Sequence, residues 1–539
     1  MTGGGVIGAL ALVTGAAGLA AAASLLPDVP RQALDPVEVS VAEPARTLAC
    51  PGPPVVPGSA GDRAVGAVGT GQDQAATDEQ FRSAPTSTTF TTDLLASSGT
   101  SSRAAAAELP PAASEERREA TLEAVGTVRR AHLSVPDAAR LTATPSGRRP
   151  PGVAAIALAS TAEGDLQGLA ATSCAAPSAE AWVVGGGTTA GRSARLVLAN
   201  PGPTAATVDV ELFTTSGVLA PPAARGVVVP AGERRELLLE GLAPDEPALA
   251  VHVQATGGRV AAFVLDSALD GLVPKGVDVA APAAAPSRSQ TVPAVRMADD
   301  TASTLRLVST GSRDAVVTWG LLGADGQATG QESVVTVPAG TVTDVDLGAA
   351  GVPPGLYTVA VQSDAPVAAA VQMVRTRQDG SGAADRAWSP STSPLTPSAG
   401  TGAPSPALVA LPAGASDVTT TLTVAAVDAP GSGDGGAQQE GLPAAVAEEA
   451  SVLVRQVSAD GSLSPPKELV VPAGTTRTVS GNDLAAPGSL GVQLTVQRGA
   501  VAAGLLLEQG TFLSAVPVHP PAEPMPQVAV RRVPTGAVP

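Results

Sequence analysis

The sequence is poor in aromatic residues, histidine and cysteine. Aromatic side chains make up 2% of the 539 residues, and there are three histidines and two cysteines. Because few large side chains are available, each core must be thin and built mainly from alanine and valine. A chain of this length suits roughly three or four domains. The 59 glycines and 50 prolines favour turns and short strands over long helices.

Positive charge is also scarce. The formal net charge is −17, and Lys275 and Lys467 are the only lysines. Nucleic acids and anionic lipid surfaces are bound through basic surfaces. We therefore expect no nucleic-acid partner.

The N-terminal region contains a long run without charge, the 21 residues from Val6 to Leu26. Such a run serves as a membrane-spanning helix or as the apolar region of a signal peptide. Ala21-Ala22-Ala23 offers a small-residue cleavage site, so removal and retention both stay open, and a buried alanine-rich helix is the alternative. We assign residues 1–30 to a signal peptide or membrane anchor. The chain is then extracytoplasmic, either secreted or held at the cytoplasmic membrane by this helix.

Cys50 and Cys174 are the only cysteines. In an exported chain an even pair suggests a disulfide. It would close a loop of over 100 residues (50 to 174), worth about 4–5 kcal/mol by chain entropy. Two buried free thiols are the alternative.

Three segments share one order of features. Each begins with alternating apolar and polar residues, passes a Ser-Gly or Asp-Gly turn, and reaches the sequence Val-Pro-Ala-Gly. A second strand and then a Val-Ala-Ala strand follow. The valine of Val-Pro-Ala-Gly lies 22, 22 and 21 residues before that second strand (229 to 251, 337 to 359, 471 to 492). The Val-Ala-Ala strands begin at Val260, Val367 and Val501.

This repeat predicts antiparallel β-structure. Alternation with period two is typical of half-buried strands, and Ser-Gly or Asp-Gly supplies the positive φ of tight hairpins. Proline in Val-Pro-Ala-Gly removes a backbone donor, so it fits a strand end or an edge strand. We expect an all-β fold of tandem immunoglobulin-like antiparallel β-sandwich modules after the N-terminal apolar helix. A propeller or solenoid is less suited, because the repeat is too long for one blade.

The predicted organisation places three modules between less regular segments. Residues 31–177 form an N-terminal region with β-strands and a mobile segment at 54–115, and Ser114 to Val125 fits a short capped helix. Modules 1, 2 and 3 cover residues 178–284, 285–379 and 405–516. Residues 380–404 are assigned to a linker, 428–442 to a loop inserted in module 3, and 517–539 to a proline-rich tail.

No set of residues forms a recognisable catalytic, metal or cofactor site. His132, His252 and His519 are far apart in sequence, and His252 is expected to face solvent from a strand. Gly185-Gly186-Gly187 lacks the lysine of a phosphate-binding loop, which favours a turn or close sheet packing. Asp344, Asp346 and Asp434 offer carboxylates for calcium but no complete ligand loop.

The three tryptophans are candidates for core packing or for ligand contact. Trp182 and Trp319 lie in apolar strand patterns, which favours the core. Trp388 lies in the predicted linker. We therefore expect it to be an exposed ring and a possible ligand contact.

Several motifs resemble a known family. They are Leu48-Ala49-Cys50-Pro51-Gly52-Pro53, Gly168-Leu169-Ala170-Ala171 with Cys174 and Pro177, Trp182-Val183-Val184-Gly185-Gly186-Gly187, and Leu196-x-Leu198-Ala199-Asn200-Pro201-Gly202. In this order they resemble the actinobacterial secreted or membrane-anchored proteins grouped as domain-of-unknown-function family 5719. The resemblance covers roughly residues 48–510 and implies an envelope location. It places both cysteines in cysteine-bearing motifs, which favours their pairing, and it supplies no catalytic residue.

The sequence thus predicts a non-catalytic scaffold or interaction protein of the cell envelope. Its expected partners are other envelope proteins or cell-wall polymer, and we expect no cofactor. One alternative is a cell-wall polysaccharide-binding protein, which Trp388 would serve. Another is an envelope hydrolase with an unrecognised site, because catalytic triads assemble from residues distant in sequence.

Overall fold

The protein is described from a computed structural model. Its described residues are 37–39, 46–52, 54, 88–97, 102–108, 119–124, 129–133, 139–144, 152–377, 383–397, 406–412, 417–428, 448–458, 462–484, 486, 489–521 and 528–530. The predicted apolar helix within 1–30 and most of the loop at 428–442 lie outside them. The expected all-β class is confirmed, because the described residues form β-strands and short 3-10 turns and no α-helix. The strands pair in antiparallel sheets. In the described part of the chain, no helix has the length and apolar character needed to cross a membrane.

The chain divides into two units, residues 1–42 with 525–539, and residues 43–524. In the first unit, β1 (Val37–Val39) pairs antiparallel with β34 (Val528–Val530). All that follows concerns the second unit.

The second unit contains four successive sets of strands with one pairing scheme. We name the sets module N, module 1, module 2 and module 3, and we name the strand positions in each module a to h in chain order. Positions a-f-c-d form one sheet and positions e-b-g-h the other. In module 2 a single long strand supplies both f and g, which joins its two sheets.

The bounds of the strands are as follows. Module N contains β2 (Arg46–Cys50), β3 (Thr88–Ser97), β4 (Ser102–Glu108), β5 (Glu119–Ala124), β6 (Arg129–Leu133), β7 (Ala139–Thr144), β8 (Gly152–Thr161) and β9 (Gly168–Ser173). Module 1 contains β10 (Glu180–Val184), β11 (Arg192–Asn200), β12 (Ala206–Phe213), β13 (Val218–Leu219) and β14 (Val227–Val229), which share position d, β15 (Glu233–Leu238), β16 (Ala250–Thr256), β17 (Ala261–Asp270) and β18 (Val273–Ala280).

Modules 2 and 3 follow the same plan. Module 2 contains β19 (Ser287–Met297), β20 (Thr301–Ser309), β21 (Ala315–Gly323), β22 (Gly326–Val337), β23 (Val342–Asp346), β24 (Gly355–Thr376) and β25 (Ala383–Pro390). Module 3 contains β26 (Ala407–Ala410), β27 (Thr419–Val427), β28 (Ala450–Ser458), β29 (Lys467–Val471), β30 (Thr476–Ser480), β31 (Ser489–Arg498), β32 (Ala500–Gln509) and β33 (Phe512–Pro517). Short 3-10 turns lie at Pro222–Ala224, Leu239–Gly241, Gly348–Ala350 and Gly481–Asp483.

The Val-Pro-Ala-Gly sequences end an edge strand in modules 1, 2 and 3. Their valines, Val229, Val337 and Val471, are the last residues of β14, β22 and β29. Proline then falls where no backbone donor is needed. The glycine of each motif has φ of 65° to 70°, which favours glycine.

Module N corrects three expectations. Part of the segment predicted as mobile forms β3 and β4, and the segment predicted as a capped helix contains β5, which pairs with β4. Cross-strand pairing therefore prevails over the local helix signals. The repeat was missed here because the connection from d to e reads Val125-Gly126-Thr127-Val128 in place of Val-Pro-Ala-Gly. The third correction is that module N is a fourth copy, which has its own Val153-Ala154-Ala155 at the start of β8.

The linker expected at 380–404 also needs correction. Residues 383–390 form β25, which pairs with β24 as strand h of module 2. The segment is rich in serine, proline and glycine, but most of those residues flank the strand Ala-Ala-Asp-Arg-Ala-Trp-Ser-Pro. The composition of the flanks concealed the strand.

The Val-Ala-Ala motif explains how the modules join. In β24, Val367 and Ala369 pack in the core of module 2, whereas Ala368 between them packs with the core of module 1. The equivalent middle alanines are Ala261, which contacts the module N cluster, and Ala502, which packs with Leu322 of module 2. A small side chain is needed at this position because sheets of two modules meet there face to face.

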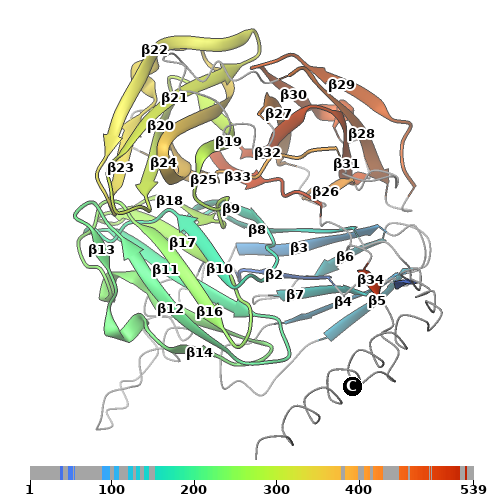
Figure 1. Cartoon of the computed structure of the whole chain (residues 1–539), viewed down its shortest axis with the longest axis horizontal. Helices are drawn as coiled ribbons and strands as arrows, with labels where there is room; N and C mark the ends of the chain where they lie inside the picture. The colour runs from blue at the N-terminus through green and yellow to red at the C-terminus, as the bar shows by residue number, and fades with distance from the viewer. Residues whose placement is uncertain are drawn as a thin grey trace, which may run out of the picture. The chain divides into compact units, whose positions relative to one another are not determined.

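The same contact closes a ring. Ala154 of module N packs against the core of module 3, together with Ile156 and Leu158. Each module therefore packs on the preceding one, and module N packs on module 3 (Figure 1). Sheets covered on both faces need small apolar residues on both sides, which accounts for the alanine and valine content.

Candidate functional site

Strands β9, β18, β25 and β33, which hold position h in their modules, meet at the centre of the ring (Figure 1). Contacts run around the centre in the order β9, β18, β25, β33 and back to β9, and β9 also contacts β25. Asp278 on β18 and Asp385 on β25 lie here, and both are 0% exposed. A buried carboxyl group needs hydrogen-bond partners. We therefore take this centre as the candidate functional site.

Asp385 is bonded to all three of the other modules. Its Oδ2 accepts hydrogen bonds from the main-chain N–H groups of Leu169 in module N and Leu513 in module 3, each at 3.0 Å. Its Oδ1 accepts one from Val277 N of module 1 at 3.3 Å. One side chain thus ties four strands together.

Asp278 does the same from module 1. Its Oδ2 accepts a hydrogen bond from Trp388 N of module 2 at 2.6 Å. Its Oδ1 lies 2.8 Å from Ser514 Oγ of module 3 and 3.4 Å from Ala171 N of module N. Each of the two aspartates therefore bonds to the three modules other than its own.

Two glycines make room for Asp385. A Cβ atom at Gly168 would lie 2.5 Å from Asp385 Oδ1, and one at Gly276 would lie 2.6 Å from Asp385 Cα. Both distances are well below van der Waals contact, so any larger residue would push the strands apart. Gly276 also has φ of +93°. Glycine is required here by close approach.

Burial dominates the acidity of both carboxyl groups. It raises the pKa of Asp385 to about 8, against the hydrogen bonds from main-chain N–H groups that oppose the rise. It raises the pKa of Asp278 well above its usual range, and the neighbouring Asp385 adds to the rise. Desolvation disfavours the charged form of an acid, which explains both directions. Neither side chain is exposed, and both accept hydrogen bonds from strands of other modules.

A third buried aspartate, Asp266, lies next to this centre and is paired with cations. Its carboxylate lies 3.0 Å from Arg192 and 3.3 Å from Arg386. Burial alone would raise its pKa, but the two guanidinium groups and a hydrogen bond from Trp388 outweigh burial and lower it. Asp266 is therefore the ionised carboxylate of the centre.

Trp388 contradicts the expectation of an exposed, ligand-binding ring. It is 1% exposed, its Nε1 donates to Asp266 Oδ2 at 2.9 Å, and the Arg306 guanidinium lies 4.9 Å from the ring centroid. The indole is buried because Trp388 lies on β25, one of the four strands at the centre of the ring of modules. Trp182 and Trp319 are buried, as expected.

The three glycines at 185–187 allow close packing. Close packing was one of the two roles expected for them, because the segment lacks the lysine of a phosphate-binding loop. A Cβ at Gly185 would lie 2.7 Å from Ala280 Cβ and 3.3 Å from the Trp388 ring. Gly186 O accepts a hydrogen bond from Arg306 Nη1 at 2.6 Å. This glycine segment thus receives two large side chains of module 2.

The two histidines whose side chains are described, His252 and His519, have separate surroundings. His252 is 7% exposed, which corrects the expectation that it faces solvent. It is stacked on Trp182 at 4.1 Å, and its two ring nitrogens lie 3.0 Å from Glu180 and Glu211. The side chain of His132 lies outside the described residues.

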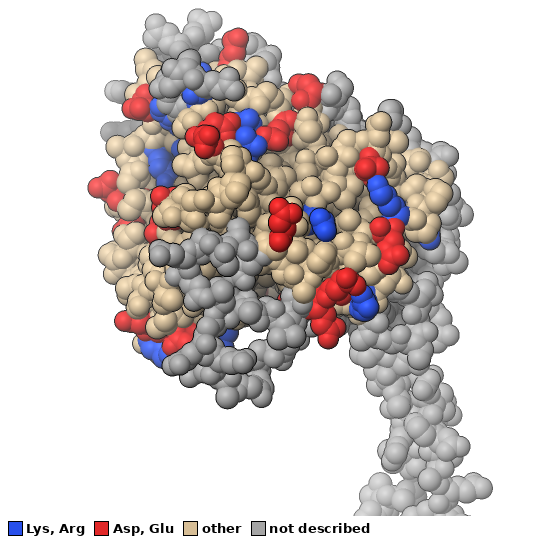
Figure 2. Space-filling model, turned by 90° about the horizontal axis from the view of Figure 1, so that it is seen from above, with Lys and Arg blue, Asp and Glu red and all other residues tan. Residues whose placement is uncertain are grey.

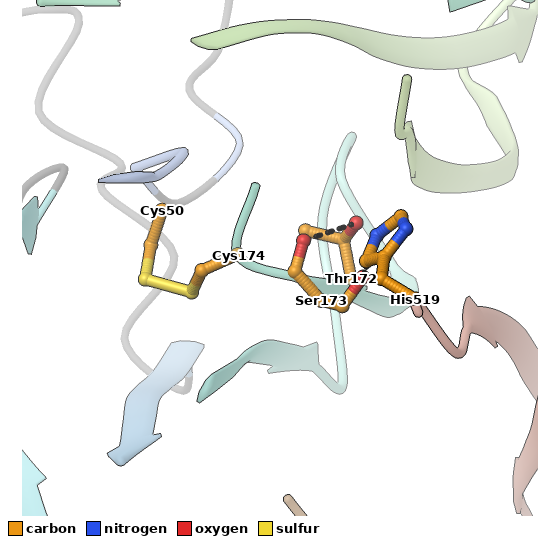
Figure 3. Close-up of a disulfide and its surroundings, with 5 residues drawn as sticks. All are labelled: Cys50, Thr172, Ser173, Cys174 and His519. Carbon is orange, nitrogen blue, oxygen red and sulfur yellow. Dashed lines mark hydrogen bonds between the residues drawn. A yellow bond between two sulfur atoms is a disulfide. The ribbon is translucent and has the colours of Figure 1, made fainter. Parts of the chain in front are cut away.

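His519 lies next to Ser173, the residue before Cys174 (Figure 3). Its Nε2 is 2.9 Å from Ser173 Oγ, and burial lowers its pKa to about 4. Cys50 at the end of β2 and Cys174 after β9 form a disulfide, which confirms the predicted pairing. The bond joins the first and last strands of module N, which belong to different sheets.

The carboxylates considered for calcium have other partners. Asp344 forms a two-point ion pair with Arg306, each contact at 2.8 Å. Asp346 accepts a hydrogen bond from Gly348 N, and Asp434 lies outside the described residues. Among the residues that the structure describes, no three His, Cys, Asp or Glu side chains are grouped as metal ligands would be.

Sequence reasoning missed Asp278 and Asp385. The available signal was an aspartate inside an apolar strand, in Gly-Val-Asp-Val-Ala and in Ala-Ala-Asp-Arg-Ala. Charged residues are rarely buried without a partner, so such a position points to a buried polar contact.

The fold and its centre define a class of protein, an all-β chain of four modules joined through buried carboxyl groups. Within that class the chain belongs to the family of unknown function DUF5719, whose family model matches residues 130–440. The match begins within module N and ends within module 3. None of the curated proteins compared with the chain matches it.

Proposed function

We propose that the protein is an exported, non-catalytic scaffold of the cell envelope, built from immunoglobulin-like β-sandwich modules. The observation that carries this proposal is the bonding of Asp278 and Asp385 to all four modules. Such bonds hold the modules in fixed positions. A fixed set of modules is suited to presenting surfaces to a partner and needs no chemistry of its own.

The strand pairing supports the immunoglobulin-like assignment. In every module, strand b pairs with e in one sheet and strand c pairs with f in the other. These are pairs that immunoglobulin-like sandwiches share. Strand g lies beside b in all four copies, which makes the modules a variant of that pattern.

The cysteine pair supports export. Both cysteines are almost fully buried, at 0% and 3% exposure, and they are bonded to each other. Disulfides persist in oxidising compartments and are rare in the cytosol. Residues 1–30 would then carry the chain across the membrane or hold it there.

The outer surface suits a protein or polymer partner. On the face shown in Figure 2, acidic and basic side chains are scattered among uncharged ones. Some apolar residues are exposed, among them Val334 on edge strand β22 at 62% and Leu272 in the β17–β18 hairpin at 93%. We propose that other envelope proteins, or cell-wall polymer, contact such positions.

In-cell crosslinking tests the scaffold role. A photoreactive phenylalanine analogue at Val334 or at Leu272 of the full chain should capture a defined envelope protein, and the same variant kept in the dark is the control. Capture of wall polysaccharide alone would favour the polymer-binding alternative. Turnover of ester, glycoside or peptide substrates by the purified chain would contradict a non-catalytic role.

Alkylation under non-reducing conditions tests export. Chain isolated from cells should gain no mass from a thiol reagent, because both cysteines are bonded. Gain of two adducts by unfolded but unreduced chain would show free thiols and would argue against an oxidising location.

A further inference from the structure

Strand c of module N is poor in large apolar residues. This strand lies inside the a-f-c-d sheet of every module. In module N it is β4, which reads Ser-Arg-Ala-Ala-Ala-Ala-Glu and contains no apolar residue larger than alanine. The equivalent strands β12, β21 and β28 contain four, five and four such residues. Burial of apolar surface is the main force that stabilises a folded domain, so strand c contributes less to the folding of module N than its counterparts do elsewhere.

Both cysteines of the chain belong to this module. Cys50 is the last residue of β2 and Cys174 follows β9, so the closed loop, with a sequence separation of 124, runs from the first strand of the module to its last. Modules 1, 2 and 3 contain no cysteine. Domains that bury little apolar surface are commonly stabilised by disulfides. The bond thus reinforces the module whose strand c lacks large apolar residues.

The disulfide is also part of the contact between modules N and 1. Cys50 and Cys174 are 0% and 3% exposed. They lie in one apolar cluster with residues of strands β11 and β17 of module 1, among them Val197, Ala199 and Phe263. Strand β2, which ends at Cys50, contacts the same two strands. The bond therefore fixes β2 of module N against the e-b-g-h sheet of module 1.

The residues next to the two cysteines contact other parts of the ring. Ala49 N donates to Ala175 O at 2.8 Å and Ala175 N donates to Ala49 O at 2.9 Å, which holds β2 against the start of the connection to module 1. Ser173 Oγ, one residue before Cys174, lies 2.9 Å from Nε2 of His519, which follows the last strand of module 3 (Figure 3). A change at the disulfide therefore acts at both junctions of module N.

The position of the loop decides which openings the bond resists. A cross-link stabilises a folded segment against any opening that frees the loop it closes. The loop of residues 50–174 lies within module N, so opening of module N alone frees it. Chain entropy for a loop of this length favours the closed form about 1000-fold or more. Modules 1 and 2 have apolar clusters of their own, and the loop includes no part of them.

We propose that the cysteine pair is a redox switch of ring closure. Formation of the disulfide docks module N between modules 1 and 3, and reduction releases module N while modules 1 and 2 stay folded. When the bond forms, the thiols of Cys50 and Cys174 together lose two protons and two electrons. An external disulfide takes them up and becomes two thiols. The setting of the switch in the cell rests on the proposed export, because an oxidising compartment supplies such disulfides.

Hydrogen exchange of the full chain tests the switch. Chain refolded with the disulfide formed is compared with chain refolded and kept in dithiothreitol. Protection of β9 in module N should fall about 1000-fold or more on reduction, whereas protection of β20 in module 2 should change by less than about 3-fold. An equal fall in β20 would show that the ring opens as one unit. Unchanged protection of β9 would show that closure does not need the bond, and either result overturns the proposal.

Re-oxidation separates the effect of the bond from that of the thiols. Oxidised glutathione added to the reduced chain should restore the protection of β9 as the two free thiols disappear. Cys50→Ala is the matched control, because its Cys174 can form only a mixed disulfide with glutathione, so the protection of β9 should stay low. Protection of β20 shows that the rest of each chain is folded. Recovery of β9 in Cys50→Ala, or no recovery in the re-oxidised wild type, would refute the switch.

Failure of the switch and failure of the proposed export give different results. Exchange is measured on purified chain and does not depend on where the chain resides in the cell. Free thiols in chain isolated from cells, together with redox-dependent protection of β9, would refute export and support the switch. Bonded cysteines in that chain, together with protection of β9 that does not depend on the bond, would support export and refute the switch.

Discussion

The indole N–H of Trp388 donates to Asp266 Oδ2 at 2.9 Å, which links strand h of module 2 to strand g of module 1. Both residues are buried, and Asp266 also holds Arg192 and Arg386. The bond is therefore made to an ionised group inside a junction between modules. Hydrogen bonds of this kind are stronger than those between neutral groups.

Trp388→Phe should lower the free energy of unfolding by about 1.5–3 kcal/mol, because it leaves a buried carboxylate short of one donor. Urea unfolding would measure the loss. Trp319→Phe is the matched control, since Trp319 is also buried but its Nε1 has no hydrogen-bond partner among the described residues. An equal loss in both variants would show that ring packing, and not the bond to Asp266, sets the effect.

Removing the disulfide should destabilise the chain strongly. The bond closes a loop with a sequence separation of 124, for which chain entropy gives about 5 kcal/mol. Unfolding of the Cys50→Ala, Cys174→Ala double variant in urea would measure the difference from the oxidised wild type. Reduced wild-type chain should match the double variant to within about 1 kcal/mol, and a much smaller loss in both would show that the loop is already constrained when unfolded.

The middle alanine of Val-Ala-Ala should not tolerate enlargement. Ala368→Leu places a larger side chain between modules 1 and 2, which should cost about 1–3 kcal/mol by overpacking. Val334→Leu, at a position that is 62% exposed, should change stability by less than about 0.5 kcal/mol. Thermal unfolding of the two variants would compare them, and a neutral Ala368→Leu would refute the tight junction.

His519 should make stability depend on pH in the acid range. Its pKa falls to about 4 in the folded chain from an ordinary value of 6.5, so between these values the unfolded chain binds the extra proton. Stability from this group therefore rises as pH increases from about 4 to 6.5. The contribution of His519 to stability therefore rises with pH, whereas that of Asp385, whose pKa is raised, falls with pH. His519→Gln should remove the contribution, so in urea unfolding between pH 4 and 6.5 the slope of stability against pH should be less positive for the variant than for the wild type.

The sequence predicted several strands of modules 1 to 3, though not β25, because their signals are local. Val-Pro-Ala-Gly marks an edge strand through the chemistry of proline and glycine, and alternation marks the faces. Module N lacks that motif, so only its Val153-Ala154-Ala155 remained as a sign of the fourth copy. The ring could not be predicted, because Ala154 and Ala368 reveal which module they contact only once the fold is known.

The centre was beyond prediction for a related reason. Asp385 contacts Leu169, Val277 and Leu513, which are 216, 108 and 128 residues away in sequence. No local pattern encodes such distances. Trp388 was misassigned because serine, proline and glycine around a short strand resemble a linker, whereas pairing with β24 buries the ring.

The module contacts run in one direction, since the a-f-c-d sheet of each module meets the e-b-g-h sheet of the next. When each module binds the next through two unlike surfaces, a row of modules leaves one free surface at each end unless it closes into a ring. A chain cut down to three modules would thus carry one unsatisfied surface of each kind. Such pieces would join end to end and grow into filaments, so the full count of four is what keeps this architecture finite.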